Sequence, residues 1–358
     1  MVTNANGLVQ RRLHTQHLAS AKLDTPHAVV SHFGAVQAQD YLGALWAVGL
    51  RMRNAVEADV ERALAERSIV RLWPQRGTLH FVAAEDARWM VDLLAPRVLA
   101  RNRGRLQREH GLDAAVLRRA RSVVERALRD GAQLTRPELY AALEKGRIAT
   151  GASRGLHILF ALAHERLLCF GARRGKQPTF VLFDEWLPSA KPKSREESLA
   201  ALTIRYFSGH GPATVADFLW WSGLTAREVR EGLALTGDAL THEDGLYFSS
   251  ASRVSRASSS THLLPPYDEY TVGYKDRSAV LDPAFAKHVN AGGGIIHPIV
   301  VVNGRVVGTW KRTLSARSIE IRVSAFRALS ARERAGLAKV AARYAGFVDP
   351  RALVDVSY

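Results

Sequence analysis

The chain has 358 residues, of which 47% are apolar and 23% charged, a composition typical of globular proteins. This length exceeds what one small core needs and predicts two to four modules. Lys and Arg number 50 against 34 acidic residues, and the net charge of +16 indicates a polyanionic partner, most simply nucleic acid. Arg supplies 41 of the 50 cations. A GC-rich genome explains the preference for Arg over Lys, but not the excess of cations over acids.

The chain contains a single cysteine, Cys169, in an apolar run. One thiol excludes an intrachain disulfide, a cysteine-based zinc finger and a protein-ligated iron–sulfur cluster, and it fits a reducing cytosol. The 13 histidines show no metal-ligand spacing such as His-Glu-x-x-His, so we expect no metal and no cofactor. The N-terminus has no apolar signal segment, and no run reaches the roughly 18 apolar residues that cross a bilayer. We therefore expect a cytoplasmic, monomeric protein without a membrane partner.

Residues 1–130 are predicted to form a first module of helices and one β-ribbon. Asp24-Thr25-Pro26 is typical of a helix start, with a capping residue and a Pro in the first turn. Further helices are expected over residues 8–20 and 56–67. Residues 69–73 and 78–82 are expected to be strands around a turn at residues 74–77. Helices followed by a two-stranded ribbon predict a winged helix.

The segment Val36-Gln37-Ala38-Gln39-Asp40 places two primary amides in an apolar neighbourhood that includes Trp46. Burying an amide without a partner costs about 1–3 kcal/mol, so the two glutamines hold something polar, cap nearby backbone or face solvent. In an extended chain their side chains point to the same side, whereas in a helix they diverge by about 200°. A site shared by Gln37 and Gln39 therefore requires an extended segment or a helix end.

Residues 85–129 are expected to be helical and carry a series of arginines. The spacing of four of them, by four, four and three residues, puts them on one face of a helix that continues past Pro96 and Gly104. These four are Arg97, Arg101, Arg105 and Arg108. Such a face suits phosphate contacts, and a solvated surface explains it equally well. We take Arg97, Arg101 and Arg105 as candidate DNA-binding residues.

The same order of elements recurs twice. Residues 131–187 are predicted to form two helices and a strand, with a basic wing loop that contains Arg173, Arg174 and Lys176. A linker rich in Pro, Ser and charge at residues 188–198 leads into three helices and a hairpin turn at Asp244-Gly245. The expected fold is mainly α with small β wings, built from three tandem winged-helix modules and a C-terminal α/β element that contains a hairpin. The expected boundaries are 1–130 for the first module with a helical extension, 131–187, 195–250 and 261–358.

The C-terminal element is predicted around a β-hairpin, after a connecting segment at residues 250–260. Asn303-Gly304 between apolar strands is a strong type I′ turn signal, and residues 324–345 are expected to be helical. The hairpin carries Arg305, Lys311 and Arg312. A basic hairpin can enter a DNA groove, and a role without DNA contact is equally open. The glycines at residues 292–294 lack the Gly-Lys-Ser/Thr of a phosphate-binding loop and run into strands.

Four segments, in this order, resemble the AlkZ-like winged-helix DNA glycosylases, a family related to YcaQ. They are Gln37-Ala38-Gln39, WPQRGTLHFV (73–82), LPPYDEYTVGYKDRS (264–278) and HPIVVVNGRVVGTWKR (297–312), so the resemblance spans most of the chain. It implies a monofunctional DNA glycosylase of base excision repair, with Gln37 and Gln39 as catalytic residues. The implied partner is double-stranded DNA that carries cationic N7-alkylated purines, including interstrand crosslinks left by a DNA-alkylating natural product, with a role in self-resistance. Some relatives have Gln-x-Asp where this chain has Gln39, which leaves the lesion range open.

The implied chemistry suits neutral amides. Gln does not act as a general base near neutral pH, but it orients water and offers carbonyl dipoles to a developing positive charge. An N7-alkylated purine already carries a positive charge and leaves as a neutral base. The enzyme therefore needs only to hold the lesion, place water and stabilise the oxocarbenium-like sugar. A crosslink is too bulky for a snug base-flipping pocket, so we expect an open site.

Three acidic residues near these motifs have competing interpretations. Asp40 caps a helix or serves as the catalytic base. Asp268 and Glu269 form structural ion pairs or line the site, and as sequence neighbours that point in different directions they make a poor catalytic dyad.

The tryptophans differ in their expected roles. Trp46 and Trp73 are core residues or base-stacking residues, whereas Trp220-Trp221 is predicted to build the core of the third module.

The rival function is a non-catalytic winged-helix transcriptional regulator that binds undamaged operator DNA. An RNA-binding protein is a weaker rival, because the sequence has no RRM or KH motif.

Overall fold

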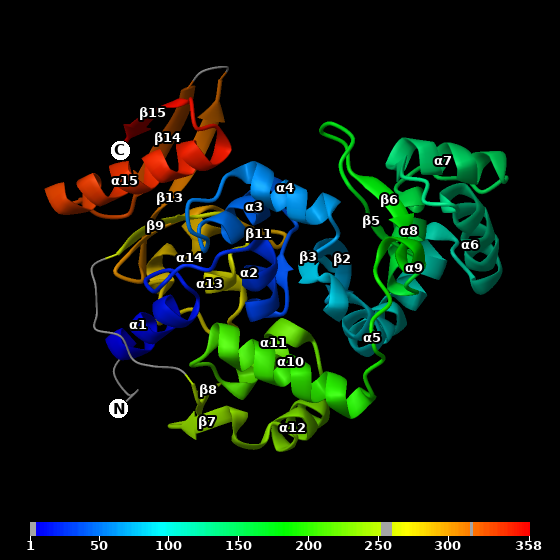
Figure 1. Cartoon of the computed structure of the whole chain (residues 1–358), viewed down its shortest axis with the longest axis horizontal. Coiled ribbons are helices and arrows are strands. Elements are labelled where there is room, and N and C mark those ends of the chain that lie inside the picture. Colours follow the sequence, from blue (N-terminus) through cyan, green and yellow to red (C-terminus); the bar gives the residue numbers. More distant parts are fainter. Residues whose placement is uncertain (1–4, 252–259, 316–317) are drawn as a thin grey trace.

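The computed structural model describes residues 5–251, 260–315 and 318–358, so residues 252–259 of the predicted connecting segment lie outside it. Three successive groups of helices, each with a small sheet, precede a C-terminal five-stranded sheet. Figure 1 shows the first group in the middle, with α5 to α8 on one side and the C-terminal sheet and α15 on the other. The predominance of helices and the small sheets agree with the prediction.

The first group surrounds a three-stranded sheet with strand order β1-β3-β2. Its helices are α1 (Ala5–Thr15), α2 (Pro26–Phe33), α3 (Tyr41–Gly49) and α4 (Glu57–Ala65), and its strands are β1 (Val36–Gln37), β2 (Ile69–Gln75) and β3 (Thr78–Ala83). The ribbon of β2 and β3 confirms the prediction, and β1 adds a third strand that the sequence did not reveal. Helix α1 ends earlier than predicted, because His17 adopts a left-handed φ of 55°.

The second and third groups follow a long helix. Helix α5 (Ala84–His110) runs through Pro96 and Gly104, as the arginine spacing requires. The second group contains α6 (Ala114–Leu128), β4 (Leu134–Thr135), α7 (Arg136–Lys145), α8 (Arg154–His164), β5 (Leu168–Phe170), β6 (Thr179–Leu182) and α9 (Phe183–Trp186). The third contains α10 (Arg195–His210), α11 (Val215–Ser222), α12 (Ala226–Ala234), β7 (Leu240–Glu243) and β8 (Leu246–Ser249). The positive φ angles of Asp244 and Gly245, 52° and 76°, confirm the predicted hairpin turn.

The C-terminal sheet has strand order β15-β14-β13-β12-β9. Its strands are β9 (Thr261–Leu264), β12 (Ile299–Val302), β13 (Arg305–Leu314), β14 (Ser318–Ala325) and β15 (Leu353–Ser357). The same part of the chain contains three helices, α13 (Glu269–Val272), α14 (Ala286–Val289) and α15 (Ala331–Val348). It also contains the separate hairpin of β10 (Asn290–Gly292) and β11 (Ile295–Ile296). Asn303 and Gly304 have φ angles of 51° and 82°, which confirms the predicted turn between β12 and β13.

The predicted helix over residues 324–345 is wrong at its start. The segment up to Ala325 is strand β14, whose apolar residues alternate with a period of two: Ile319, Ile321 and Val323. Helix α15 begins only after Ser330, whose hydroxyl accepts a hydrogen bond from the backbone N–H of Glu333 in a capping box.

The first and last parts of the chain share one core. The ring of Tyr344 in α15 packs edge-on against Trp46 in α3, with 5.1 Å between ring centroids. A Cβ on Gly49 would lie 2.2 Å from the ring of Phe347, so only glycine allows α15 to approach α3 this closely. Arg343 donates hydrogen bonds to the carbonyls of Leu50 and Met52, just after α3. The C-terminal element therefore supports the helix that follows the two glutamines.

Candidate active site

The two glutamines lie in a short segment between two helices. Helix α2 ends at Gly34, whose φ of 79° turns the chain into β1. In β1, Gln37 pairs with His80 of β3, and the next backbone nitrogen, that of Ala38, donates to the carbonyl of Leu79. Asp40 then caps α3 by accepting a hydrogen bond from the backbone nitrogen of Gly43 over 2.6 Å. The chain is extended at Gln37, whereas Gln39 lies in a bend beyond β1, and Asp40 acts as the predicted helix cap.

The two amides have different surroundings. The side chain of Gln37 is 7% exposed, and its Oε1 accepts one long hydrogen bond of 3.5 Å from Nη2 of Arg76. Gln39 is exposed, and its Oε1 accepts a hydrogen bond of 3.3 Å from the backbone nitrogen of Leu79. The hydrogen bond of Gln39 agrees with the alternative in which the amides bind nearby backbone, whereas the amide of Gln37 makes only a weak contact.

A cavity of about 380 Å³ lies beside Gln37. Its walls come from the β2–β3 turn, α11, the segment around α13 and the β10–β11 hairpin. The lining side chains include Gln37, Arg76, Thr78, Trp220, Tyr267, Arg277 and Ile295. Four segments that are distant in sequence thus meet around one of the two predicted catalytic residues.

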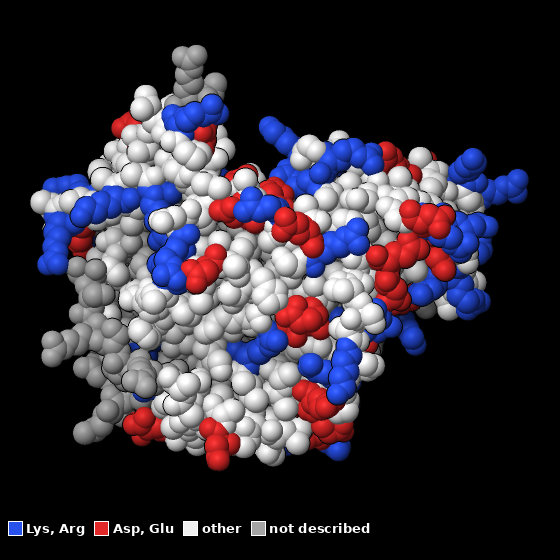
Figure 2. Space-filling view, in the orientation of Figure 1, with Lys and Arg blue, Asp and Glu red and all other residues white. Residues whose placement is uncertain are grey.

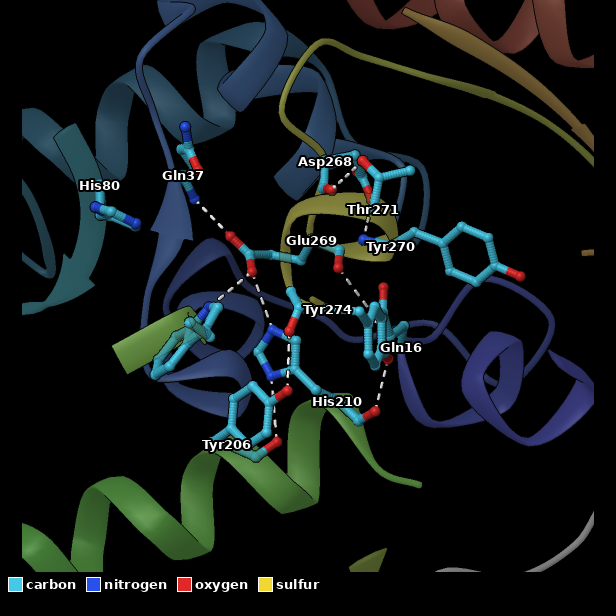
Figure 3. Close-up of polar contacts among 12 residues, drawn as sticks. Gln16, Gln37, His80, Tyr206, His210, Asp268, Glu269, Tyr270, Thr271 and Tyr274 are labelled. Atoms are coloured by element: carbon cyan, nitrogen blue, oxygen red, sulfur yellow. Dashed lines mark hydrogen bonds and ion pairs between the residues drawn. The ribbon is translucent and has the colours of Figure 1, made fainter. Parts of the chain in front are cut away.

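Glu269 holds the strand that carries Gln37 (Figure 3). Its carboxylate is buried, and Oε1 accepts a hydrogen bond of 2.8 Å from the backbone nitrogen of Gln37. Oε2 faces Nε2 of His210 at 3.0 Å and accepts a hydrogen bond of the same length from Nε1 of Trp221. Burial raises the pKa of Glu269, but the hydrogen bond and charge of His210 and the hydrogen bond from Gln37 outweigh it, so the pKa lies below its ordinary value. Glu269 is therefore an ionised carboxylate beneath β1.

The neighbouring carboxylate, Asp268, points away from Glu269 into a separate ion pair. Both of its oxygens accept hydrogen bonds of 2.8 Å from the guanidinium of Arg51, and both side chains are buried. Asp268 also caps α13. The structural interpretation of both carboxylates is thus confirmed, and they form no dyad.

Two further residues that sequence reasoning did not select fix the amide segment. Arg71 of β2 donates from Nε and Nη2 to the carbonyl of Ala38, at 3.1 and 2.8 Å, and so holds the residue between the two glutamines. His80, opposite Gln37, is fully buried, with Nδ1 3.0 Å from the carbonyl of Thr78. Burial lowers the pKa of His80 to about 4, so its ring is neutral at neutral pH.

The predicted DNA-binding residues lie in two separate regions. Arg101 and Arg105 are exposed on α5, whereas Arg97 on the same helix forms an ion pair of 2.5 Å with Glu228. The other three residues are on β13. Lys311 is exposed, and Arg305 donates a hydrogen bond to Asn6. Arg312 is half-buried and contacts the hydroxyl of Tyr344. Figure 2 shows basic side chains on both rims of the hollow between the C-terminal sheet and the lobe of α6 to α8. The structure thus brings Arg101 together with Arg105, but not with the residues of β13.

Three of the four tryptophans considered in the sequence are core residues, and only Trp220 differs from the prediction. Trp46 and Trp73 are buried, so neither is available for base stacking. Trp221 is in the core as predicted, but Trp220 is exposed and lines the cavity beside Gln37. Helical periodicity gives the reason: Phe218 and Trp221 are three residues apart on the buried face, which turns Trp220 outward. This signal was present in the sequence.

The chain matches the sequence model of a family described as "DNA glycosylase AlkZ-like" over residues 30–347. A curated relative from Streptomyces sahachiroi, named "Interstrand DNA cross-link repair glycosylase", is 29% identical over 324 residues, which cover 84% of this chain and 85% of the relative. The fold is similar to the solved structure of the Streptomyces sahachiroi DNA glycosylase AlkZ, with a TM-score of 0.77 and 24% identity over 99% of this chain and 100% of the other. These findings confirm the resemblance of the four sequence segments, and the chain belongs to the AlkZ-like DNA glycosylase family.

Proposed function

We propose that this protein is a monofunctional DNA glycosylase that hydrolyses the N-glycosidic bond of cationic N7-alkylated purines in double-stranded DNA, with Gln37 and Gln39 as its catalytic residues. One observation carries the proposal. Gln37 lines a cavity and is held through its backbone nitrogen by buried Glu269, while its side-chain amide has, among the described residues, only a 3.5 Å contact with Arg76. A rigid backbone with a loosely engaged amide suits a group that binds water or substrate.

The charge of the site fits a cationic leaving group. The positively charged base departs as a neutral purine, so no strong general acid is needed. Positive charge then develops on the sugar, and the amide carbonyls of Gln37 and Gln39 stabilise it as oriented dipoles. The ionised carboxylate of Glu269 lies behind Gln37 and adds a negative field, as a positioning residue that does not contact the substrate. One glutamine orients the attacking water while the other contacts the sugar or base.

We extend the proposal to interstrand crosslinks formed by a DNA-alkylating natural product, and to a role in self-resistance. The name of the Streptomyces sahachiroi relative refers to interstrand crosslink repair. Gln39 is exposed, which supports an open site that accepts an adduct too large for a base pocket.

We also propose that the three helix-and-sheet groups are tandem winged helices, with modules at 1–130, 131–187 and 195–250 and the α/β element at 261–358. A monomer is expected to bind double-stranded DNA through Arg97, Arg101, Arg105, Arg305, Lys311 and Arg312. The net charge of +16 and the exposed positions of Arg101, Arg105 and Lys311 support this DNA contact.

The test compares duplexes that contain 7-methylguanine or guanine at one position. We expect the wild-type protein to leave abasic sites only in the methylated duplex, without the strand cleavage that a bifunctional lyase produces. Gln37→Ala and Gln39→Ala should each slow base release, and the double variant should abolish it. Gln107→Ala removes an exposed amide of α5 and should have no effect. A wild-type protein that binds both duplexes without releasing base is instead a DNA-binding regulator, and a double variant with the parental rate removes the glutamines from the mechanism.

A further inference from the structure

Trp220 is exceptional among the seven tryptophans of the chain. Its side chain is 47% exposed, whereas the other six have exposed fractions between 0% and 7%. A large aromatic side chain that faces water, in a protein whose other indoles are buried, is a candidate contact for a ligand.

Trp220 lies in the cavity that contains Gln37. It is near the end of α11, and the guanidinium carbon of Arg76 lies 6.0 Å from the centroid of its ring. Nη1 of Arg76 also donates a hydrogen bond of 3.2 Å to the carbonyl of Trp220. The β2–β3 turn, which carries Arg76, therefore holds the end of α11 beside Gln37.

The buried neighbour of Trp220 connects α11 to the same carboxylate that holds Gln37. Nε1 of Trp221 donates to Oε2 of Glu269, while the backbone nitrogen of Gln37 donates to Oε1. The exposed indole and the amide of Gln37 are thus positioned by the two oxygens of one side chain. Their relative placement is fixed before any substrate binds.

We propose that Trp220 is a specificity-determining residue whose indole face binds the positively charged, alkylated nucleobase. This inference rests on the proposed function, which supplies the cationic purine. The indole ring has a negative face and is the strongest cation–π partner among the side chains, so it favours a cationic purine over a neutral one. Once the glycosidic bond breaks, the base is neutral and this attraction weakens, which assists release of the product.

The cations in the cavity do not oppose this assignment. Arg76 interacts electrostatically with the Glu269 carboxylate, and Arg277, which also lines the cavity, donates a hydrogen bond to Asn290. Phosphates that flank the lesion are natural partners for both guanidinium groups. The cavity then offers guanidinium groups to the phosphates and an aromatic face to the base.

The experiment measures binding and catalysis separately. The binding arm uses two duplexes that differ only at one position, guanine or a 7-methylguanine whose sugar carries a 2′-fluorine so that the base is not released. Trp220→Ala should reduce the preference for the methylated duplex by about 3- to 30-fold, the range expected for loss of one partly desolvated cation–π contact. Trp220→Phe should retain part of it. Leu235→Ala is the matched control, because Leu235 is 46% exposed in the third helical group but does not line the cavity.

Three further readouts distinguish this role from a structural one. Because the side chain is exposed, the midpoint of thermal unfolding should stay unchanged in Trp220→Ala. Acrylamide should quench the fluorescence of Trp220 selectively, and the methylated duplex should protect it from quenching. In the catalytic arm, Trp220→Ala should raise KM for 7-methylguanine release more than it lowers kcat.

The outcomes separate the inference from the proposed function. A wild-type protein that releases no 7-methylguanine contradicts the proposed function, while the binding arm still tests Trp220. A Trp220→Ala variant whose binding preference stays within a factor of two of the wild-type value overturns the inference about Trp220 but leaves the proposed function intact. Equal weakening on both duplexes also overturns it, because the indole is then a general DNA contact. If Trp220→Ala does not fold, Trp220→Phe and the protection from quenching decide the question.

Discussion

The carboxylate of Glu269 accepts a hydrogen bond of 2.8 Å from the backbone nitrogen of Gln37, although 232 positions separate the two residues in the chain. The same carboxylate binds Trp221 and His210, so one buried group joins β1, α10, α11 and α13. The geometry of the candidate site is therefore determined by a residue outside the glutamine motif.

Glu269→Gln should weaken both the fold and the reaction. The substituted amide has one carbonyl oxygen for three N–H donors, so at least one buried donor loses its partner and the charge near His210 disappears. We expect a loss of about 3–5 kcal/mol in the free energy of unfolding, the usual cost of removing one partner of a buried ion pair. Urea denaturation measures this, and single-turnover base release should slow in parallel. Glu320→Gln, on β14, is the control, because the Glu320 side chain is 39% exposed and paired only with surface Arg322 among the described residues. An equal loss in that variant contradicts a special role for Glu269.

His80 should make the fold sensitive to mild acid. Burial lowers the pKa of His80 to about 4, whereas the unfolded ring has its ordinary value of 6.5. Below pH 6.5 the unfolded chain therefore binds a proton that the folded chain does not, and stability falls until the pH reaches the folded pKa. At pH 5 this linkage amounts to about 2 kcal/mol.

The measurement is the free energy of unfolding at pH 7.5 and pH 5.0. His80→Gln should reduce the difference between the two values, because Gln does not titrate. His242→Gln, at an exposed position, should leave the difference unchanged. A His80→Gln variant with the full wild-type difference shows that other groups cause the acid sensitivity.

Arg71→Lys should slow the reaction while the protein still folds. Lysine cannot reproduce the two hydrogen bonds from Nε and Nη2 to the carbonyl of Ala38, so the segment between the glutamines becomes more mobile. We expect a decrease of about 10-fold or more in single-turnover base release, as for loss of a hydrogen bond from a charged donor. Arg62→Lys is the control, because the Arg62 side chain on α4 is exposed. An unchanged rate in Arg71→Lys removes this residue from the positioning network.

The arginines of α5 should differ in their contribution to DNA affinity. Exposed Arg101 and Arg105 are expected to bind phosphates, so replacing either with alanine should reduce the slope of log affinity against log salt by about 0.9. Arg97 is already paired with Glu228, so Arg97→Ala should change the slope less. Titrations of undamaged duplex between 50 and 200 mM salt test this, at salt concentrations where such slopes are well resolved. Equal slopes in all three variants and the wild type place α5 outside the DNA interface.

Local signals in the sequence predicted the local structure. Asn303-Gly304 and Asp244-Gly245 both form hairpin turns with positive φ angles, because these pairs tolerate the left-handed conformation that such turns need. The requirement that Gln37 and Gln39 lie in an extended segment followed from side-chain geometry alone, and β1 meets it for Gln37. The helix cap at Asp40 followed from its position before an apolar helix.

Contacts across long sequence distances could not be predicted in this way. Nothing near Glu269 indicates that it will accept a hydrogen bond from Gln37, and nothing near Arg71 indicates the carbonyl of Ala38. The predicted helix began at Ser324, although Ser324 and Ala325 are the last residues of β14, in which Ile319 and Ile321 already alternate as a strand requires. The exposure of Trp220 could have been predicted from the sequence, because its position next to buried Trp221 on the helix turns it outward.

The contact of α15 with α3 has a consequence for biosynthesis. The rings of Tyr344 and Phe347, which cover Trp46 and Gly49, are synthesised long after the residues that they cover. The glutamine-bearing part of the nascent polypeptide therefore completes its folding only after α15 has been synthesised. Premature termination or proteolytic trimming before α15 should therefore expose Trp46 and yield a product that releases no base.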